Sequence, residues 1–424
     1  MPKCNYEYKP KVPNVLEDIP PEIPLDCKVP TENGKFCIFH DKDYYVKSAK
    51  QAITPKYEVA KRFEDKVKES IDQNKPLICF GYYLPGINFA ELLGKSIAQP
   101  VYFSQATFSK ESNFRGATFT ERADFVRAKF TEGAWFGRAT FSKDADFRGV
   151  KFLDEVYFLH DKFKEKILFR YTLFEQQNKV TFGDNDLSKV SFAGSDVTRI
   201  RFGDGITWGG KDKITIIEEE WLRERAEGQT KTEVENVKLE LVLSVYRNLR
   251  ENYEFRLRYD DAGKFFIKEM ELKRKYREIR TENDTQTKKN GWFRRHFSLT
   301  GLYYHLSTYG ESISKPVAIG ALTVFLSTLF WVIQSNPSLE PHFDPNLAET
   351  VGNSTFVGVR EFGNPTQWLK GLERSLAGFI PLLSLGGETE VGIIDFIIKI
   401  FGGGLTFVLL AIALRRKFER KYTR

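Results

Sequence analysis

The sequence predicts a multidomain protein with a repetitive β domain, a helical hairpin and an α-helical membrane domain of two spans. Three observations lead to this fold class. Phenylalanine returns every five or six residues from Phe103 to Phe174, helical periodicity replaces this spacing after Trp208, and two long apolar segments lie toward the C-terminus. With 424 residues, 41% of them hydrophobic, the chain has material for several cores.

The repeat has the spacing of β-strands. A small or β-branched residue stands two positions before most of the phenylalanines, as Ala117 does before Phe119. Residues two apart in a strand point to the same side, whereas residues five and six apart do not share one stripe of a helix. The in-frame phenylalanines, expected to point inward, are Phe103, Phe108, Phe114, Phe119, Phe125, Phe130, Phe136, Phe141, Phe147, Phe152, Phe158, Phe163, Phe169 and Phe174.

Units such as Ala117-Thr118-Phe119 and Ala123-Asp124-Phe125 resemble the pentapeptide-repeat family, over about a quarter of the chain. This resemblance implies a right-handed quadrilateral β-helix, with one repeat per side and the phenylalanine in the core. The frame weakens after Phe174 but continues to Phe202, with an insertion near Gln176. We therefore assign residues 78–210 to the β-helix and expect roughly five coils. Asp161 and Thr172 replace the small apolar residue of their units.

The segment of residues 1–45 contains Cys4, Cys27, Cys37 and His40, the last two in a Cys-x-x-His spacing. Three thiolates and one imidazole complete a tetrahedral structural zinc site, which suits a Pro-rich segment with few periodic apolar residues. The alternative is a set of unrelated reduced cysteines. Cys79, in an apolar run, is expected in the core.

Helices are expected on both sides of the β-helix. In residues 46–77, Val59, Phe63, Val67 and Ile71 recur every fourth residue and predict a short amphipathic helix that covers the first coil. Residues 211–285 predict an antiparallel helical hairpin, with Val237, Leu241, Val245 and Leu249 on one face of its first helix and Asp260-Asp261 as the N-cap of its second. We expect this hairpin to be a linker to the membrane.

The C-terminal third predicts a membrane domain. Residues 316–334 and 391–415 are the two expected transmembrane helices, preceded by an aromatic interfacial helix at 286–315. Basic residues precede the first span and fill the tail at 416–424, so both termini are expected in the cytoplasm of a multi-pass cell-membrane protein and the loop at 335–364 outside. The start of the chain, Met1-Pro2-Lys3-Cys4-Asn5, lacks the pattern of a signal peptide.

Between the spans, residues 365–390 form an apolar helical segment that ends in Ser384-Leu385-Gly386-Gly387-Glu388, and Gly402-Gly403-Gly404 lies within the second span. This order resembles the pore helix, filter and hinge of two-span tetrameric cation channels. The resemblance implies a pore at residues 384–388 and a hinge at 402–404. The filter-like segment lacks the aromatic residue of potassium channels and is one residue shorter, so their selectivity does not carry over. The alternatives are an ordinary turn at Gly386-Gly387 and tight helix packing at 402–404.

These observations predict a homotetrameric cation channel with a cytoplasmic sensor or scaffold domain, in contact with membrane lipid and inorganic cations. The alternative is a non-conducting, membrane-anchored scaffold that binds a cytoplasmic protein partner. Nucleic acid is not an expected partner, because arginines such as Arg115 and Arg127 interleave with the acids of the repeat. An enzyme is not expected either, since His160, His296, His305 and His342 are scattered along the sequence and no nucleophile–base pair is evident.

Overall fold

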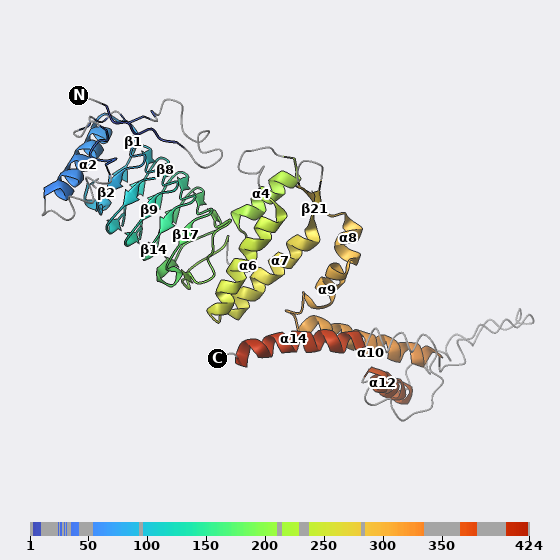
Figure 1. Cartoon of the computed structure of the whole chain (residues 1–424). Helices are drawn as coiled ribbons and strands as arrows, with labels where there is room; N and C mark the ends of the chain where they lie inside the picture. Colours follow the sequence, from blue (N-terminus) through green and yellow to red (C-terminus); the bar gives the residue numbers. More distant parts are fainter. Residues whose placement is uncertain are drawn as a thin grey trace, which may run out of the picture. The chain divides into compact units, whose positions relative to one another are not determined.

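The structure is a computed structural model. It describes residues 3–9, 24, 26–27, 29, 31, 35–41, 54–92, 96–209, 214–228, 237–280, 285–334, 365–379 and 404–422. The chain divides into two compact units, Met1–Asn290 and Gly291–Arg424, and each is described by itself (Figure 1).

The first unit contains a β-solenoid with four parallel walls, which confirms the predicted β-helix with four sides. The walls are named by their first strands. The β1 wall has β1 (Leu77–Ile78), β4 (Val101–Tyr102), β8 (Ala123–Asp124), β12 (Ala145–Asp146), β16 (Ile167–Leu168) and β19 (Val190–Ser191). The β2 wall has β2 (Tyr83–Leu84), β5 (Thr107–Phe108), β9 (Lys129–Phe130), β13 (Lys151–Phe152) and β17 (Leu173–Phe174). The β6 wall has β6 (Ser112–Asn113), β10 (Ala134–Trp135), β14 (Val156–Leu159), β18 (Val180–Gly183) and β20 (Arg201–Phe202). The β3 wall has β3 (Ser96–Ile97), β7 (Thr118–Phe119), β11 (Thr140–Phe141) and β15 (Lys162–Phe163).

The solenoid has about six turns, as the six strands of the β1 wall show, and the expected number of five is wrong. The extra coil lies before the regular phenylalanine frame. Its inward positions are filled by Cys79, Leu84, Phe89 and Ile97, which are at most 3% exposed. Because only one of these four residues is phenylalanine, the number of coils expected from the phenylalanines was one too low, although the assigned range of 78–210 includes this coil.

The core is made of stacked phenylalanine rings. Phe103, Phe125 and Phe147 are aligned one above the other, with ring centroids 5.3 and 4.9 Å apart. All the in-frame phenylalanines from Phe103 to Phe174 are buried except Phe163, which is half-buried. Phe163 also faces inward, in register with Phe141 and packed against the core, so the predicted inward frame holds there, although its side chain is only half-buried.

The two polar residues that break the repeat are buried and hydrogen-bonded to the backbone. Asp161 Oδ1 accepts from the Ala139 amide at 2.8 Å. The hydroxyl of Thr172 donates to the Phe147 carbonyl at 2.8 Å. Each replaces the apolar contact of its unit by a polar one, although Asp161 Oδ2 is buried without a hydrogen-bond partner among the described residues. The insertion near Gln176 forms the short helix η1 (Gln177–Lys179).

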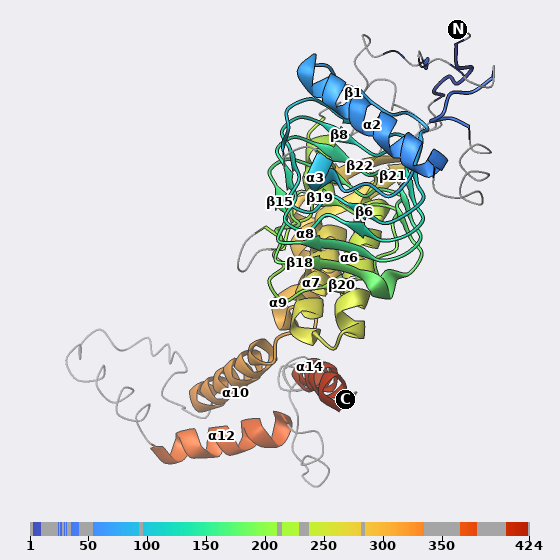
Figure 2. The same ribbon diagram turned by 90° about the vertical axis from the view of Figure 1, so that its left-hand side faces the viewer.

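Helix α2 (Thr54–Asp72) lies across the first coil, as Figures 1 and 2 show, and the short helix α3 (Phe89–Leu92) belongs to that coil. Val59, Phe63 and Val67 are buried as expected, but Ile71 is 38% exposed. Ser70 is buried one position earlier, where its hydroxyl donates to the Lys75 carbonyl at 2.6 Å and ends the helix.

The predicted hairpin linker caps the last coil of the solenoid. It consists of α4 (Ile217–Ala226), α6 (Leu239–Phe255), α7 (Tyr259–Lys275) and a strand pair, β21 (Tyr276–Arg280) with β22 (Thr285–Lys289). The amide of Asn252 donates to the carbonyls of Val197 and Ile200, both at 2.7 Å. These bonds satisfy carbonyls that have no further coil to pair with. The expected N-cap at Asp260-Asp261 is wrong, because α7 begins at Tyr259.

The second unit is helical. It contains α8 (Trp292–Phe297), α9 (Leu299–Ser307), α10 (Ser314–Gln334), α12 (Pro365–Phe379) and α14 (Leu405–Tyr422). Among the described residues, one helix is long and apolar enough to cross a membrane, at Ser314–Ile333 with a mean hydropathy of 2.1. The apolar part of α14, Leu405–Arg415, is shorter, and residues 391–403 of the expected second span lie outside the described part of the chain. The structure thus supports one candidate span.

Candidate metal centre

Cys4, Cys27, Cys37 and His40 converge, although 36 residues separate the first from the last. Their ligand atoms all lie within 4.8 Å of one another. His40 Nδ1 is 3.4 Å from Cys4 Sγ and 3.3 Å from Cys37 Sγ, and Cys27 Sγ is 3.7 Å from Cys37 Sγ. The four predicted ligands therefore form one cluster.

Short backbone interactions position the ligands. Glu7 and Asp26 form an isolated antiparallel bridge, and the Cys27 amide donates to the Tyr6 carbonyl at 3.1 Å. Residues 37–40 form a tight turn, in which the His40 amide donates to the Cys37 carbonyl at 2.9 Å. This turn places the third and fourth ligands on the same side of the backbone. The Cys37 amide also donates to Cys4 Sγ at 3.3 Å, which favours a thiolate there.

The distances fit a tetrahedral ion. With Zn–S near 2.3 Å and Zn–N near 2.0 Å, the edges of a tetrahedron measure about 3.5 to 3.8 Å. The contacts of 3.3, 3.4 and 3.7 Å lie close to these edges. Three sulfurs and one nitrogen fill all four positions of the tetrahedron and leave none open for a substrate or water, so the arrangement suits a structural site rather than a catalytic one.

The environment of His40 orients its ring for metal binding. Nε2 lies 2.7 Å from the Phe80 carbonyl, a contact that requires the proton on Nε2. Nδ1 is then left with a lone pair directed at the cysteine sulfurs. The Tyr6 ring stacks on the imidazole at 3.8 Å, and the Tyr82 ring meets it edge-on at 5.0 Å. Such partners of a ligating histidine fix both its tautomer and its orientation.

Burial and a hydrogen bond between two of the cysteines set the thiol pKa values in this cluster. Burial raises the pKa of Cys4, and the hydrogen bond with Cys27 together with burial raises the pKa of Cys37 to about 12. The same hydrogen bond lowers the pKa of Cys27. A divalent cation reverses the preference for neutral thiols, because it stabilises the thiolates that bind it. The donor set therefore fits a metal such as zinc.

Cys79 is not part of the cluster. Its side chain is fully buried at an inward position of the first coil, as expected, and burial raises the pKa of its thiol to about 12.

The predicted pore lies outside the described residues, which include none of Ser384, Leu385, Gly386, Gly387 and Glu388. Of the predicted hinge, Gly402 and Gly403 are also outside. Gly404 is described immediately before α14, where an added Cβ would meet no atom within 4 Å.

Two of the histidines that look scattered in the sequence meet in the structure. His296 Nδ1 on α8 and His305 Nε2 on α9 are 3.0 Å apart, with their rings stacked at 5.2 Å. Their separation of nine residues across a helix boundary carries no periodic signal. The two rings join α8 to α9.

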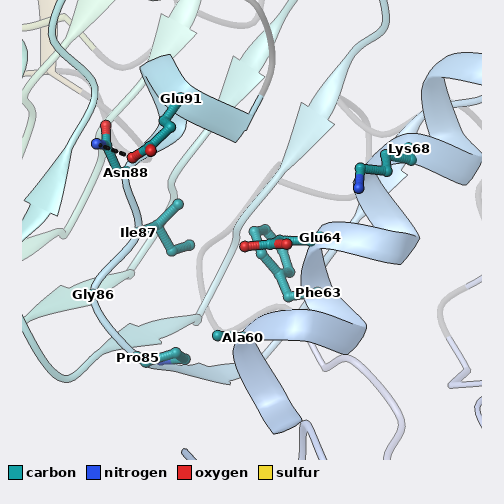
Figure 3. A pocket seen from close by; sticks show the side chains of 9 residues that line it. All are labelled: Ala60, Phe63, Glu64, Lys68, Pro85, Gly86, Ile87, Asn88 and Glu91. Atoms are coloured by element: carbon teal, nitrogen blue, oxygen red, sulfur yellow. Dashed lines mark hydrogen bonds between the residues drawn. The ribbon is translucent and has the colours of Figure 1, made fainter. Parts of the chain in front are cut away.

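A small hollow of about 340 Å³ lies between α2 and the first coil. Figure 3 shows Phe63 and Lys68 of α2 on one side and Ile87, Asn88 and Glu91 on the other. The Asn88 amide donates to Glu91 at 2.8 Å, so the polar groups across from α2 satisfy each other. The hollow has an apolar floor and mixed charges at its rim, and sequence reasoning did not predict it.

Comparison with known families agrees with the walls of the solenoid. Residues 103–151 match the model of pentapeptide repeats, with nine copies. This stretch is a pentapeptide-repeat domain. The structure extends the same strand ladder to both sides of the matched residues, from Leu77 to Phe202. No curated protein and no solved structure matches the chain. The comparison and the structure therefore support a pentapeptide-repeat scaffold domain.

Proposed function

We propose that this protein is a homotetrameric cation channel whose pentapeptide-repeat solenoid serves as a cytoplasmic sensor or scaffold. The observation that supports this proposal best is the packing of α12 on the candidate span α10. Ser375 Oγ lies 3.2 Å from Thr328 Oγ1 and 3.1 Å from Ser327 Oγ. An added Cβ at Gly371 would approach Trp331 to 3.1 Å and Thr328 to 3.2 Å. Small residues and hydroxyl pairs are how helices join inside membranes.

The length and the free face of α12 fit a pore helix. Its 15 residues reach about 22 Å, which is too short to cross a hydrocarbon core of about 30 Å. The face away from α10 exposes Leu369, Leu372 and Leu376 by 63%, 39% and 43%. A short helix with a leucine face needs a further apolar surface. Four copies around an axis supply such a surface and enclose the segment that follows α12.

In this proposal both termini lie in the cytoplasm, Ser384 to Glu388 form the narrow outer part of the pore, and residues 402–404 form the hinge of a second span. Glu388 repeated around the axis would concentrate cations. Membrane lipid and inorganic cations are the proposed partners. The proposed function involves neither nucleic-acid binding nor catalysis.

Conductance of the purified protein in planar bilayers tests the proposal. We expect cation current from the wild type, a lower cation conductance for Glu388→Gln and a weakened or reversed cation preference for Glu388→Lys. Glu390→Gln, which removes the same charge two residues later, is the matched control and should change the current less. Absence of current at every voltage, pH and calcium concentration, together with cross-linked dimers only, would refute the channel.

The second candidate is a non-conducting, membrane-anchored scaffold. The capping of both ends of the solenoid supports it, because α2 covers the first coil and α6 the last, which leaves the outer walls for a cytoplasmic protein partner. Silent bilayers and a dimer in detergent would favour this function over the channel.

For the metal centre, we propose one structural zinc ion bound by Cys4, Cys27, Cys37 and His40. Elemental analysis of the purified protein should give one equivalent, which Cys37→Ser should remove. Cys79→Ser is the control that should retain the metal, since Cys79 lies in the core. Less than about a tenth of an equivalent in the wild type would end the proposal.

A further inference from the structure

The metal centre is attached directly to the first coil of the solenoid. His40 Nε2 donates a hydrogen bond to the Phe80 carbonyl, and the Tyr83 amide donates to the Phe39 carbonyl at 2.8 Å. The rings of Phe39 and Tyr82 stack at 4.5 Å. The turn that carries two of the four ligands is thus seated on the stretch that joins β1 to β2.

The segment that carries the first ligand, residues 3–9, continues over the outer face of the β1 wall. We call this segment the strap. The ring of Tyr8 stacks on Phe80 at 4.3 Å and packs with Tyr102 and Val126, and Tyr8 is 2% exposed. Burial raises the pKa of Tyr8 to about 12, and Ser104 is a hydrogen-bond partner of its hydroxyl. Farther along, Gln105 donates to the Lys9 carbonyl at 2.9 Å.

The face beneath and beyond the strap is unusual for the outside of a solenoid. Outward residues on a wall ordinarily meet solvent, yet Tyr102, Asp124 and Asp146 are only 1%, 0% and 2% exposed. Burial and the neighbouring Asp146 raise the pKa of Asp124. Ser104 donates to Asp124 Oδ1 at 2.5 Å, and Arg148 pairs with Asp146 at 2.6 Å. This aromatic and acidic patch, formed by Phe80, Tyr102, Val126 and Asp124, is withdrawn from water.

Apart from the ring packing of Tyr6 and Tyr8 and the bond from Gln105 to the Lys9 carbonyl, the described strap is held by the metal ligands and by short backbone contacts. Three described backbone contacts join the strap to other parts of the N-terminal segment. The Asn5 amide donates to the Lys35 carbonyl at 2.9 Å, the Cys27 amide donates to the Tyr6 carbonyl, and Glu7 forms the isolated bridge with Asp26. Isolated bridges of this kind contribute little by themselves. Coordination ties Cys4 to ligands 23, 33 and 36 residues away, and such cross-links are strongest where long loops are closed.

We propose that the metal centre acts as a clasp: while the ion is bound, it holds the strap over the patch of Phe80, Tyr102, Val126 and Asp124, and loss of the ion releases the strap and opens that patch. The clasp rests on the zinc site proposed above. As a consequence, the solvent accessibility of the β1 wall depends on whether the metal is bound. The burial of the stacked phenylalanine core does not depend on the metal.

Hydroxyl-radical footprinting of the full-length protein in detergent tests the clasp, because it reports the accessibility of individual side chains. We compare protein with one equivalent of zinc and protein depleted by a chelator. Oxidation of Tyr102 and Phe80 should rise at least about fivefold on depletion, since both rings change from buried to solvent-exposed. Tyr157, an outward residue of the β6 wall, should not change. Hydrogen exchange on the same samples should accelerate at the Tyr83 and Cys27 amides, while Phe125 in the core stays protected.

Tyr8→Ala separates the clasp from general unfolding. This variant should keep one equivalent of zinc and yet show raised oxidation of Tyr102, whereas the neighbouring Lys9→Ala should behave as the wild type. Unchanged oxidation of Tyr102 in protein that demonstrably loses one zinc would overturn the clasp and leave the zinc site intact. Protein that never contains zinc would overturn both. Loss of protection at Phe125 on depletion would show that the metal supports the whole solenoid, which also contradicts a local clasp.

Discussion

Replacement of Phe125 by alanine probes the phenylalanine ladder at its centre. Phe125 is wholly buried, with Phe103 stacked on one side at 5.3 Å and Phe147 on the other at 4.9 Å. The rings of Phe114 and Phe136 meet it edge-on, at 5.7 and 6.1 Å. Truncation removes one ring from the middle of a stack whose backbone is held by parallel ladders on both sides, so the coil cannot collapse to fill the space.

The expected cost follows from these contacts. Burial of a phenylalanine side chain contributes about 1.5–3 kcal/mol, and each well-oriented aromatic pair adds about 0.5–1.5 kcal/mol. With two stacked partners lost and a cavity left behind, we expect a destabilisation of about 3–5 kcal/mol.

Hydrogen exchange of the full-length protein in detergent measures this loss within the solenoid. The Phe103 and Phe147 amides, bonded to Asp124 and Leu168, should lose about two to three and a half powers of ten in protection. The control is Lys129→Ala, an exposed residue of the same coil, which should change stability by less than about 0.5 kcal/mol. Thr120, whose position between core residues predicts an outward side chain, is a poor control because its hydroxyl donates to the Ile97 carbonyl at 2.9 Å. Equal effects of Phe125→Ala and Lys129→Ala would refute the inward frame.

Burial raises the pKa of Asp161 to about 8, whereas an aspartate in the unfolded chain has a pKa near 3.9. Between these two values the folded state binds one proton more than the unfolded state. The free energy of unfolding of the wild type therefore falls as the pH rises from about 4 to 8. Asp161→Asn keeps a hydrogen-bond donor where the carboxylic acid has its proton. In denaturation curves of both proteins, this variant should be more stable than the wild type by roughly 3–5 kcal/mol at pH 8 and by little at pH 4. The same difference in stability at both pH values would contradict the raised pKa of Asp161. Asn252→Ala removes both side-chain bonds to the last coil and should cost about 2–3 kcal/mol, seen as faster exchange at the Ile200 amide, whereas Glu251→Ala on the exposed side of α6 should have no such effect. If Asn252→Ala leaves the last coil fully protected, α6 is not its cap.

The solenoid could be predicted from the sequence because each unit repeats the same pattern of inward and outward residues. Ala123 and Phe125 are two residues apart and lie on the same side of the strand, and the recurrence of this unit implies that consecutive coils stack in register. The same local logic was incomplete at the ends. Cys79 and Leu84 occupy core positions of a coil without the repeated phenylalanine, and Phe163 keeps the inward frame but is only half-buried.

The four candidate ligands could also be named from the sequence, by a Cys-x-x-His spacing and two further cysteines in a Pro-rich segment, although unrelated reduced cysteines were the alternative there. The partners that orient them could not be named in this way. The Phe80 carbonyl that accepts from His40 is forty residues away, and a backbone oxygen leaves no mark in the sequence.

By itself, the sequence determined the repeat, its inward face, the four candidate metal ligands and the apolar segment at 316–334, because each depends on residue type and spacing or on a regular period. Only the tertiary structure decided that the hairpin at 239–275 caps the solenoid, that the strap covers one wall and that His296 meets His305. Those contacts join side chains to groups distant in the chain, and their free energy depends on burial and geometry that arise only once the chain has folded.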